Sequence, residues 1–244
     1  MLSKIKSMSL EGLNGYLVEI QTDVSGGLPN FEVVGLPDVR VKEAKERVKT
    51  AIKNSGIEFP SRKIIVNLAP ADIRKEGTFF DLSIAIGILI AIGEISKIKI
   101  ENFESTIFLG ELSLDGNVNR VNGVLPMCIE ALELGIKRVI LPKENAIEAS
   151  IIKGLEIVPV DDLTGTIEYI TGNLKIPNYV SKENINLKNI QNYEFDFSDV
   201  KGQENAKRAL EIAATRFTQL STLSGLLVQA KACCQKELWQ FYQI

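Results

Sequence analysis

Histidine is absent from the 244 residues, and tryptophan occurs only once. Because histidine is the commonest general base and a common metal ligand near neutral pH, its absence excludes most histidine-dependent catalysis and metal binding. The three cysteines are Cys128, in an apolar helical pattern, and the adjacent pair Cys233 and Cys234. No pair has the spacing of zinc ligands, and no disulfide framework is implied. We therefore expect a reduced, cytoplasmic protein with incidental cysteines and no metal site.

The chain also lacks an excess of charge and a long apolar run. Its formal net charge is −3, so the composition gives no overall basic field of the kind that many nucleic-acid-binding domains carry. The most apolar window, 82–95, is interrupted by Gly87, Gly93 and Glu94. It is shorter than the roughly 20 residues that a helix needs to span a bilayer. The N-terminus has no apolar segment of signal-peptide type, and we expect no membrane association.

Short apolar runs alternate with helical periodicity over residues 1–172. Runs of β-branched and apolar residues predict strands at 3–10, 16–24, 31–34, 63–68, 138–141 and 155–160. Helical spacing and capping residues, among them Asp38 and Asp161-Asp162, predict helices at 41–52, 82–92, 124–134, 142–152 and 162–170. A hairpin formed by 106–114 and 118–121 is predicted around Asp115-Gly116-Asn117.

The stretch 66–93, VNLAPADIRKEGTFFDLSIAIGILIAIG, is the segment around which we expect the domain to be organised. The run 82–92 predicts a helix that is buried on most of its surface. Thr78 and Asp81 have the spacing of a capping box. A catalytic loop is the alternative, because five polar residues cluster here: Asp72, Lys75, Glu76, Asp81 and Ser83. A hydroxyl inside an apolar helix usually bonds back to a carbonyl, and no partner base is in view, so we favour a structural role.

Other candidate sites have simpler structural interpretations. Gly26-Gly27 and the pair Gly12 and Gly15 lack the flanking residues of a phosphate loop, and turns explain them. Asp161-Asp162 has no third oxygen ligand at motif spacing, so helix capping is favoured over a metal. The charged run 42–49 is interpreted as a solvated helix face, with ligand binding as the alternative.

Four blocks of sequence resemble the ComM/YifB family of magnesium-chelatase-like AAA+ ATPases: LEGLNGYLVEIQTDVSGGLPNFEVVGLPD, KIIVNLAPADIRKEGTFFDLSIAIGIL, FLGELSLDGNVNRVNGVLP and DFSDVKGQENAKRALEIAA. They occur in the family's order between residues 1 and 215. The resemblance implies an α/β (α+β, two-layer) domain similar to ribosomal protein S5 domain 2 and Lon protease over 1–172. Residues 173–200 hold no sustained periodicity and are interpreted as a linker. The resemblance further implies the first helix of an AAA+ module over 201–215, and 216–244 are interpreted as an aberrant tail. Intact relatives are implied to be hexameric DNA helicases that use ATP and Mg and act in natural transformation.

The chain resembles Lon but lacks both residues of the Lon catalytic dyad, so the resemblance implies no peptidase site. Lon-type proteases carry their serine in a Gly-Pro-Ser-Ala-Gly segment, and here the matching segment is Gly77-Thr78-Phe79-Phe80-Asp81. Their lysine follows Gly-Gly-Leu, and here Leu125 follows Asn122-Gly123-Val124. Phe79 thus stands in place of the serine, and Leu125 stands in place of the lysine.

The family's phosphate loop would lie shortly after 211–214, and no such loop is present. Lys231 has no glycine beside it, and Gly225 stands alone. The codons that could encode 225–234 can also be translated one base out of register, with the last base of each codon joined to the first two of the next. In that shifted frame the genetic code permits GPPGSGKSML, a full Walker A sequence. Our hypothesis is a frameshift near Thr215, and a genuinely divergent C-terminus remains the alternative.

We therefore assign no catalytic, cofactor-binding or metal-binding residue. The favoured function is that of a non-catalytic N-terminal domain that lacks the ATPase core. The expected partners are other copies in a ring and DNA contacted through the intact motor. A stand-alone protein- or DNA-binding module is the first alternative. A Lon-like hydrolase using Ser83 is the least favoured.

Overall fold

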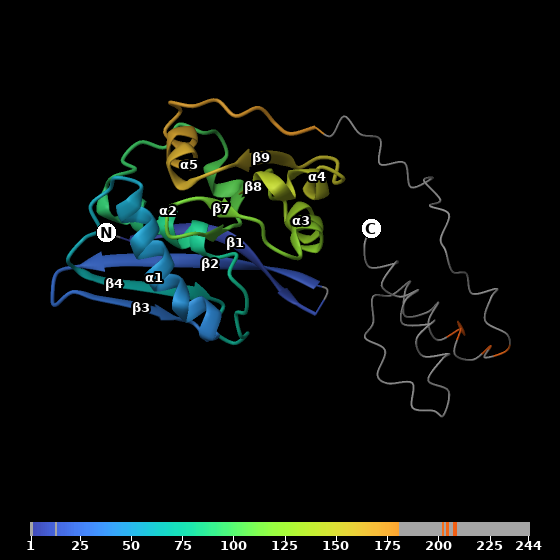
Figure 1. The fold of residues 1–244 in the computed structure, drawn as a ribbon, viewed down its shortest axis with the longest axis horizontal. Helices are drawn as coiled ribbons and strands as arrows, with labels where there is room; N and C mark the ends of the chain where they lie inside the picture. Colours follow the sequence, from blue (N-terminus) through green and yellow to red (C-terminus); the bar gives the residue numbers. More distant parts are fainter. Residues whose placement is uncertain (1, 13, 181–201, 203, 205–206, 209–244) are drawn as a thin grey trace. The chain divides into compact units, whose positions relative to one another are not determined.

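Seven strands form one mixed sheet in the computed structural model, in the order β3-β4-β2-β1-β5-β8-β9 (Figure 1). Their bounds are β1 Leu2–Glu11, β2 Asn14–Ser25, β3 Asn30–Val34, β4 Lys63–Ala69, β5 Thr106–Phe108, β8 Arg138–Pro142 and β9 Glu156–Val160. Strand β2 pairs antiparallel with β1 and β4, and the other four pairings are parallel. The expected α/β class is confirmed.

Five α-helices pack around this sheet: α1 Val39–Asn54, α2 Asp81–Ile92, α3 Val124–Glu133, α4 Ala146–Ala149 and α5 Leu163–Ile170. Helix α2 packs against β1, β2 and α1, and α3 packs against β1 and β2. The structure describes residues 2–12, 14–180, 202, 204 and 207–208. Most of the predicted linker (173–200), AAA+ helix (201–215) and all of the tail (216–244) therefore lie outside the described residues and stay predictions.

The chain after Gly172 contacts β9 at Asn178 and Tyr179. The N–H of Tyr179 donates to the Ile157 carbonyl at 2.8 Å, and the N–H of Ile157 donates to Asn178 Oδ1 at 2.8 Å. The compact unit accordingly spans Met1–Lys182, beyond the boundary at Gly172 that the sequence suggests.

Helix α2 is buried almost all round, as the apolar run predicts. Ten of its twelve residues are buried, and Gly87 allows close approach to the sheet, because a Cβ there would lie 2.8 Å from Thr22 Oγ1. The hydroxyl of Ser3 donates to the Gly87 carbonyl at 2.7 Å. Ser83 bonds back to the Phe80 carbonyl at 2.8 Å, which confirms the structural role expected of its hydroxyl.

The predicted capping box of Thr78 and Asp81 is wrong. Helix α2 begins at Asp81, and the residue before it, Phe80, makes no side-chain capping bond. The Asp81 carboxylate is held by Arg47 and by a backbone N–H instead. The other predicted caps are confirmed, since Asp38 accepts from the N–H of Val41 and Asp162 from that of Gly165.

Two further expectations need correction. The hairpin at 106–121 is shorter than predicted: β5 joins the large sheet between β1 and β8, and only β6 Glu111–Leu112 pairs with β7 Val118–Asn119. Gly110, with φ 159°, separates β5 from β6. The helix predicted at 142–152 is a 3₁₀ turn, Lys143–Asn145, followed by the single turn α4.

One ion pair joins α1 to the start of α2. Arg47 Nε lies 2.6 Å from Asp81 Oδ2, and a second guanidinium nitrogen lies 3.0 Å from Oδ1. The N–H of Leu112 in β6 donates to Oδ2 at 3.2 Å. Because the carboxyl group is fully buried, desolvation raises the pKa of Asp81 to about 6, while Arg47 and Leu112 act in the opposite direction. The ionised form of Asp81 therefore depends on Arg47.

We expect Arg47→Met to lower the free energy of unfolding by about 3–5 kcal/mol at neutral pH, because it leaves a buried carboxylate unpaired. Without Arg47 the folded-state pKa of Asp81 rises further above its unfolded value. The difference in the free energy of unfolding between wild type and variant should then shrink as the pH falls from neutral towards the pKa of Asp81 in the unfolded chain, because the buried carboxyl group becomes protonated in both proteins. Urea denaturation at several pH values measures both effects.

Arg40→Met is the matched control, since Arg40 lies on the same helix and is exposed. Its effect should stay within about 0.5 kcal/mol. Equal losses in the two variants, or a deficit in Arg47→Met that does not depend on pH, would contradict a structural ion pair.

Candidate functional site

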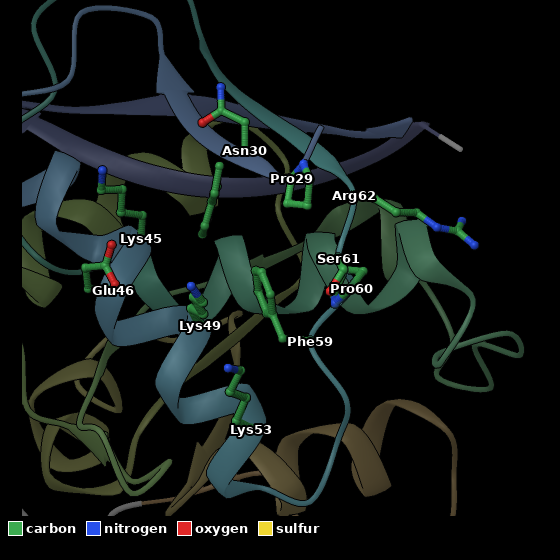
Figure 2. Close-up of a pocket in the computed structure, with 11 residues that line it drawn as sticks. Pro29, Asn30, Lys45, Glu46, Lys49, Lys53, Phe59, Pro60, Ser61 and Arg62 are labelled. Carbon is green, nitrogen blue, oxygen red and sulfur yellow. The ribbon is translucent and has the colours of Figure 1, made fainter. Parts of the chain in front are cut away.

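A groove runs between α1 and the segments that flank β3 and β4 (Figure 2). Its volume is about 370 Å³. The residues that line it come from α1, from the start of β3 and from the loop before β4: Pro29, Asn30, Phe31, Lys45, Glu46, Lys49, Lys53, Phe59, Pro60, Ser61 and Arg62. Four of these are cations and one is an acid, in a chain whose formal net charge is −3. The groove is therefore a local basic feature on a mildly acidic protein.

Three lysines form a row along α1 (Figure 2). Lys45, Lys49 and Lys53 are spaced four residues apart, so they lie on one face of the helix at steps of about 6 Å. The neighbouring face of α1 carries buried residues such as Ala44 and Val48, which face the core. This lysine row is consequently directed away from the core by the packing of α1.

Aromatic and proline side chains supply the apolar part of the groove. Phe31 on β3 and Phe59 in the loop before β4 have ring centroids 5.9 Å apart at an interplanar angle of 35°. Both rings are half-buried. Figure 2 shows Phe59 beside the lysine row, with Arg62 extending away from α1. The groove thus offers positive charges and aromatic surface together, which suits an extended anionic ligand, and it contains no activated nucleophile.

Only part of this site is predictable from the sequence. The charged run predicts a solvated face over 42–49, and Lys42 and Glu43 are indeed exposed outside the groove. The same pattern did not single out Lys53, Phe59 or Arg62. The available signal was the i, i+4, i+8 spacing of lysines followed by an aromatic residue.

The five polar residues around the central loop do not form a catalytic arrangement. Ser83 is buried and bonded to a backbone carbonyl, and Asp81 is bound to Arg47. Asp72 and Glu76 are exposed, and Glu76 lies 3.4 Å from Arg74. No hydrogen bond between described residues connects the Ser83 hydroxyl to a base.

Lys75 is fully buried, which the sequence did not indicate. Its Nζ donates to the Ile73 carbonyl at 2.7 Å, and burial lowers its pKa. Its backbone bonds to Leu36 and Asp38, so it fixes the central loop to the start of α1. These contacts give Lys75 a structural role.

The positions that match the Lon dyad hold structural side chains. Phe79 is buried, with its ring centroid 4.7 Å from that of Phe80, and its carbonyl accepts from the N–H of Gly110. The N–H of Leu125 donates to Glu148. Neither side chain is a nucleophile or a base. The Cys128 thiol is also unsuited to catalysis, because burial raises its pKa to about 12.

The acidic pair before α5, Asp161 and Asp162, makes structural contacts. Asp162 caps the helix, and Asp161 pairs with Lys143 at 3.2 Å on the surface. Within the described ranges, no group of three or more Cys, Asp or Glu side chains is placed to hold a metal ion. No helix in that same part of the chain has the length and apolarity to cross a membrane.

Comparison with known proteins places this geometry in a family. Residues 20–145, just over half of the chain, match the model of subunit ChlI of Mg-chelatase. The competence protein ComM of Haemophilus influenzae is 38% identical over 216 residues, which are 87% of this chain and 41% of that protein. YifB of Escherichia coli is 36% identical over 213 residues, 87% of this chain and 40% of that protein.

A more distant match is Lon protease 2 of Bacillus subtilis, 29% identical over 189 residues, 69% of this chain and 33% of that protein. The chain thus spans about two fifths of the length of the ComM and YifB proteins that it matches. The match to ChlI, together with the ordered similarity to ComM and YifB, shows that the chain belongs to the Mg-chelatase ChlI-like family, in the group of ComM and YifB.

Proposed function

We propose that the chain serves as a non-catalytic N-terminal domain of a ComM/YifB-type, magnesium-chelatase-like AAA+ protein. The observation that supports this most strongly is the 38% identity to ComM, which extends over 87% of the chain. The Ser83 hydroxyl in the central helix donates to a backbone carbonyl rather than to a base, which agrees with a domain that binds or positions rather than catalyses. In this proposal, ring assembly with further copies and DNA processing belong to the intact protein.

In this proposal, ATP chemistry belongs to an AAA+ module and not to the α/β unit. A Walker A loop holds phosphates with backbone N–H groups and a lysine, and places a Ser or Thr on Mg²⁺. The sequence from 211 to 244 contains no segment of this pattern. Residues 2–12 and 14–180 contribute a folded α/β unit and the basic groove on α1.

We predict that the purified 244-residue chain neither binds nor hydrolyses ATP. Titration with a fluorescent ATP analogue in the presence of Mg²⁺, and a phosphate-release assay, should both give the signal of a protein-free blank. Saturable nucleotide binding would show that a phosphate site exists in this chain and would overturn the assignment.

The reading frame supplies a separate prediction. If 216–244 arise from a frameshift near Thr215, the nucleotide sequence one base out of register should encode a Walker A loop across codons 225–234. Restoring that frame should then produce a protein that binds ATP. A shifted frame closed by stop codons, or one that encodes no glycine-rich loop, would refute the frameshift and favour a divergent C-terminus.

The peptidase alternative predicts cleavage that depends on Ser83. Because the Ser83 hydroxyl is buried and donates to the Phe80 carbonyl, we expect no cleavage of unfolded casein by the wild type, and Ser83→Ala should give the same background rate. A Lon-type protease assayed in parallel confirms that the substrate is competent. Activity that is present in the wild type and abolished in Ser83→Ala would contradict the non-catalytic proposal.

A further inference from the structure

We propose that the groove of Lys45, Lys49, Lys53, Phe31 and Phe59 is a binding site for single-stranded nucleic acid. The inference concerns the α/β unit itself and depends on neither an ATPase core nor ring assembly. It therefore goes beyond the proposed function, and its test can fail while that proposal stands.

The lysine row is the first observation. Three side chains on one helix face repeat at steps of about 6 Å, and such a repeat matches a ligand whose negative charges also recur at regular intervals along a chain. The phosphates of a nucleic-acid strand have this property. Phosphate contacts from lysine supply sequence-independent affinity by releasing counterions. The positive charge is concentrated in the groove, since the whole chain carries −3.

The aromatic pair is the second observation. Phe31 and Phe59 both line the groove and keep part of their surface exposed. Proteins that bind single strands combine a positively charged groove with aromatic rings on which bases stack. An acidic peptide would pair with the lysines but would leave these rings without planar partners. The joint presence of charge and rings therefore favours a nucleic acid over a peptide.

The size of the groove favours a single strand over a duplex. A volume of about 370 Å³ is at the lower end of the range for small-ligand pockets, which is enough space for an unpaired base and its sugar to enter. Unpaired bases can enter such a groove because they are not held in a stacked duplex. Asn30 and Ser61 line the same groove and provide hydrogen-bonding groups for base edges or sugars.

Glu46 opposes the proposed ligand. It is the acidic residue among those that line the groove, and it is next to Lys45 in the sequence. A phosphate near the lysine row would be repelled by this carboxylate. Removing its charge without changing its shape should therefore strengthen binding, an effect opposite in sign to that of the lysine substitutions.

The test uses the full 244-residue chain and fluorescence anisotropy with labelled oligothymidylate and oligouridylate of about 12 nucleotides, a length within the site sizes of single-strand binders. The dissociation constant is measured at several salt concentrations. Three phosphate contacts predict a slope of log K against log salt of about −2, from roughly −0.7 per contact on single strands. The two oligonucleotides distinguish DNA from RNA as the strand bound, and saturable binding of either supports the site.

The triple variant Lys45→Glu, Lys49→Glu, Lys53→Glu should weaken binding at least tenfold and remove most of the salt slope. A second triple variant, Lys97→Glu, Arg120→Glu, Lys153→Glu, changes the net charge equally at exposed positions outside the groove. Circular dichroism and thermal melting establish that each variant is folded.

Two further variants test the contribution of the Phe59 ring and the repulsion by Glu46. Phe59→Leu keeps an apolar side chain but removes the ring, and it should weaken binding about fivefold or more. Glu46→Gln should tighten binding. A loss of binding in Phe59→Leu is not expected if the lysines merely attract any polyanion, because that variant keeps every charge.

Several outcomes would overturn the proposal. Equal binding by the wild type and the groove triple variant, or equal losses in both triple variants, would show that the groove is not the site. Competition by a glutamate-rich peptide that exceeds competition by the oligonucleotide would identify the groove as a protein-docking surface. Duplex DNA that binds as tightly as the single strand would indicate attraction to charge alone.

Discussion

The buried carboxylate of Asp81 is the constraint on which the arrangement of the helices depends. It lies at the start of a helix that is apolar on nearly every side, where an unpaired charge would be costly. Arg47 meets it with two hydrogen bonds, and β6 adds a third through Leu112. This contact adds a planar, two-point link to the packing of the buried α1 residues Val41, Ala44 and Val48, and together they fix the rotation of α1 about its own axis. The same rotation directs Lys45 and Lys49 into the groove.

The parts of the fold that are determined by residues close together in the sequence were predictable from the sequence. The β-branched runs, the caps Asp38 and Asp162, and the all-round apolar character of α2 are local signals, and the structure reproduces them. The Thr78 cap failed because a partner distant in sequence, Arg47, takes the carboxylate that a capping box would use. Sequence spacing alone cannot identify such a partner.

The candidate site was harder to predict for the same reason. The lysine row has a clear helical period, but that period is equally typical of a solvated helix face. The lysine row can be interpreted as a binding site only because Phe31 and Phe59, from two other segments, line the same groove. Lys75 is a second case, since an ionisable residue in a polar loop is expected to be exposed and here is fully buried.

The contact of the exit segment with β9 has a consequence for how the molecule behaves among its neighbours. β9 is a terminal strand of the sheet, and strands in that position offer unpaired N–H and C=O groups to other chains. Asn178 and Tyr179 already occupy both backbone groups of Ile157. The segment that follows α5 therefore protects this edge strand from pairing with a strand of a second molecule. A domain truncated at Gly172 would lose that protection.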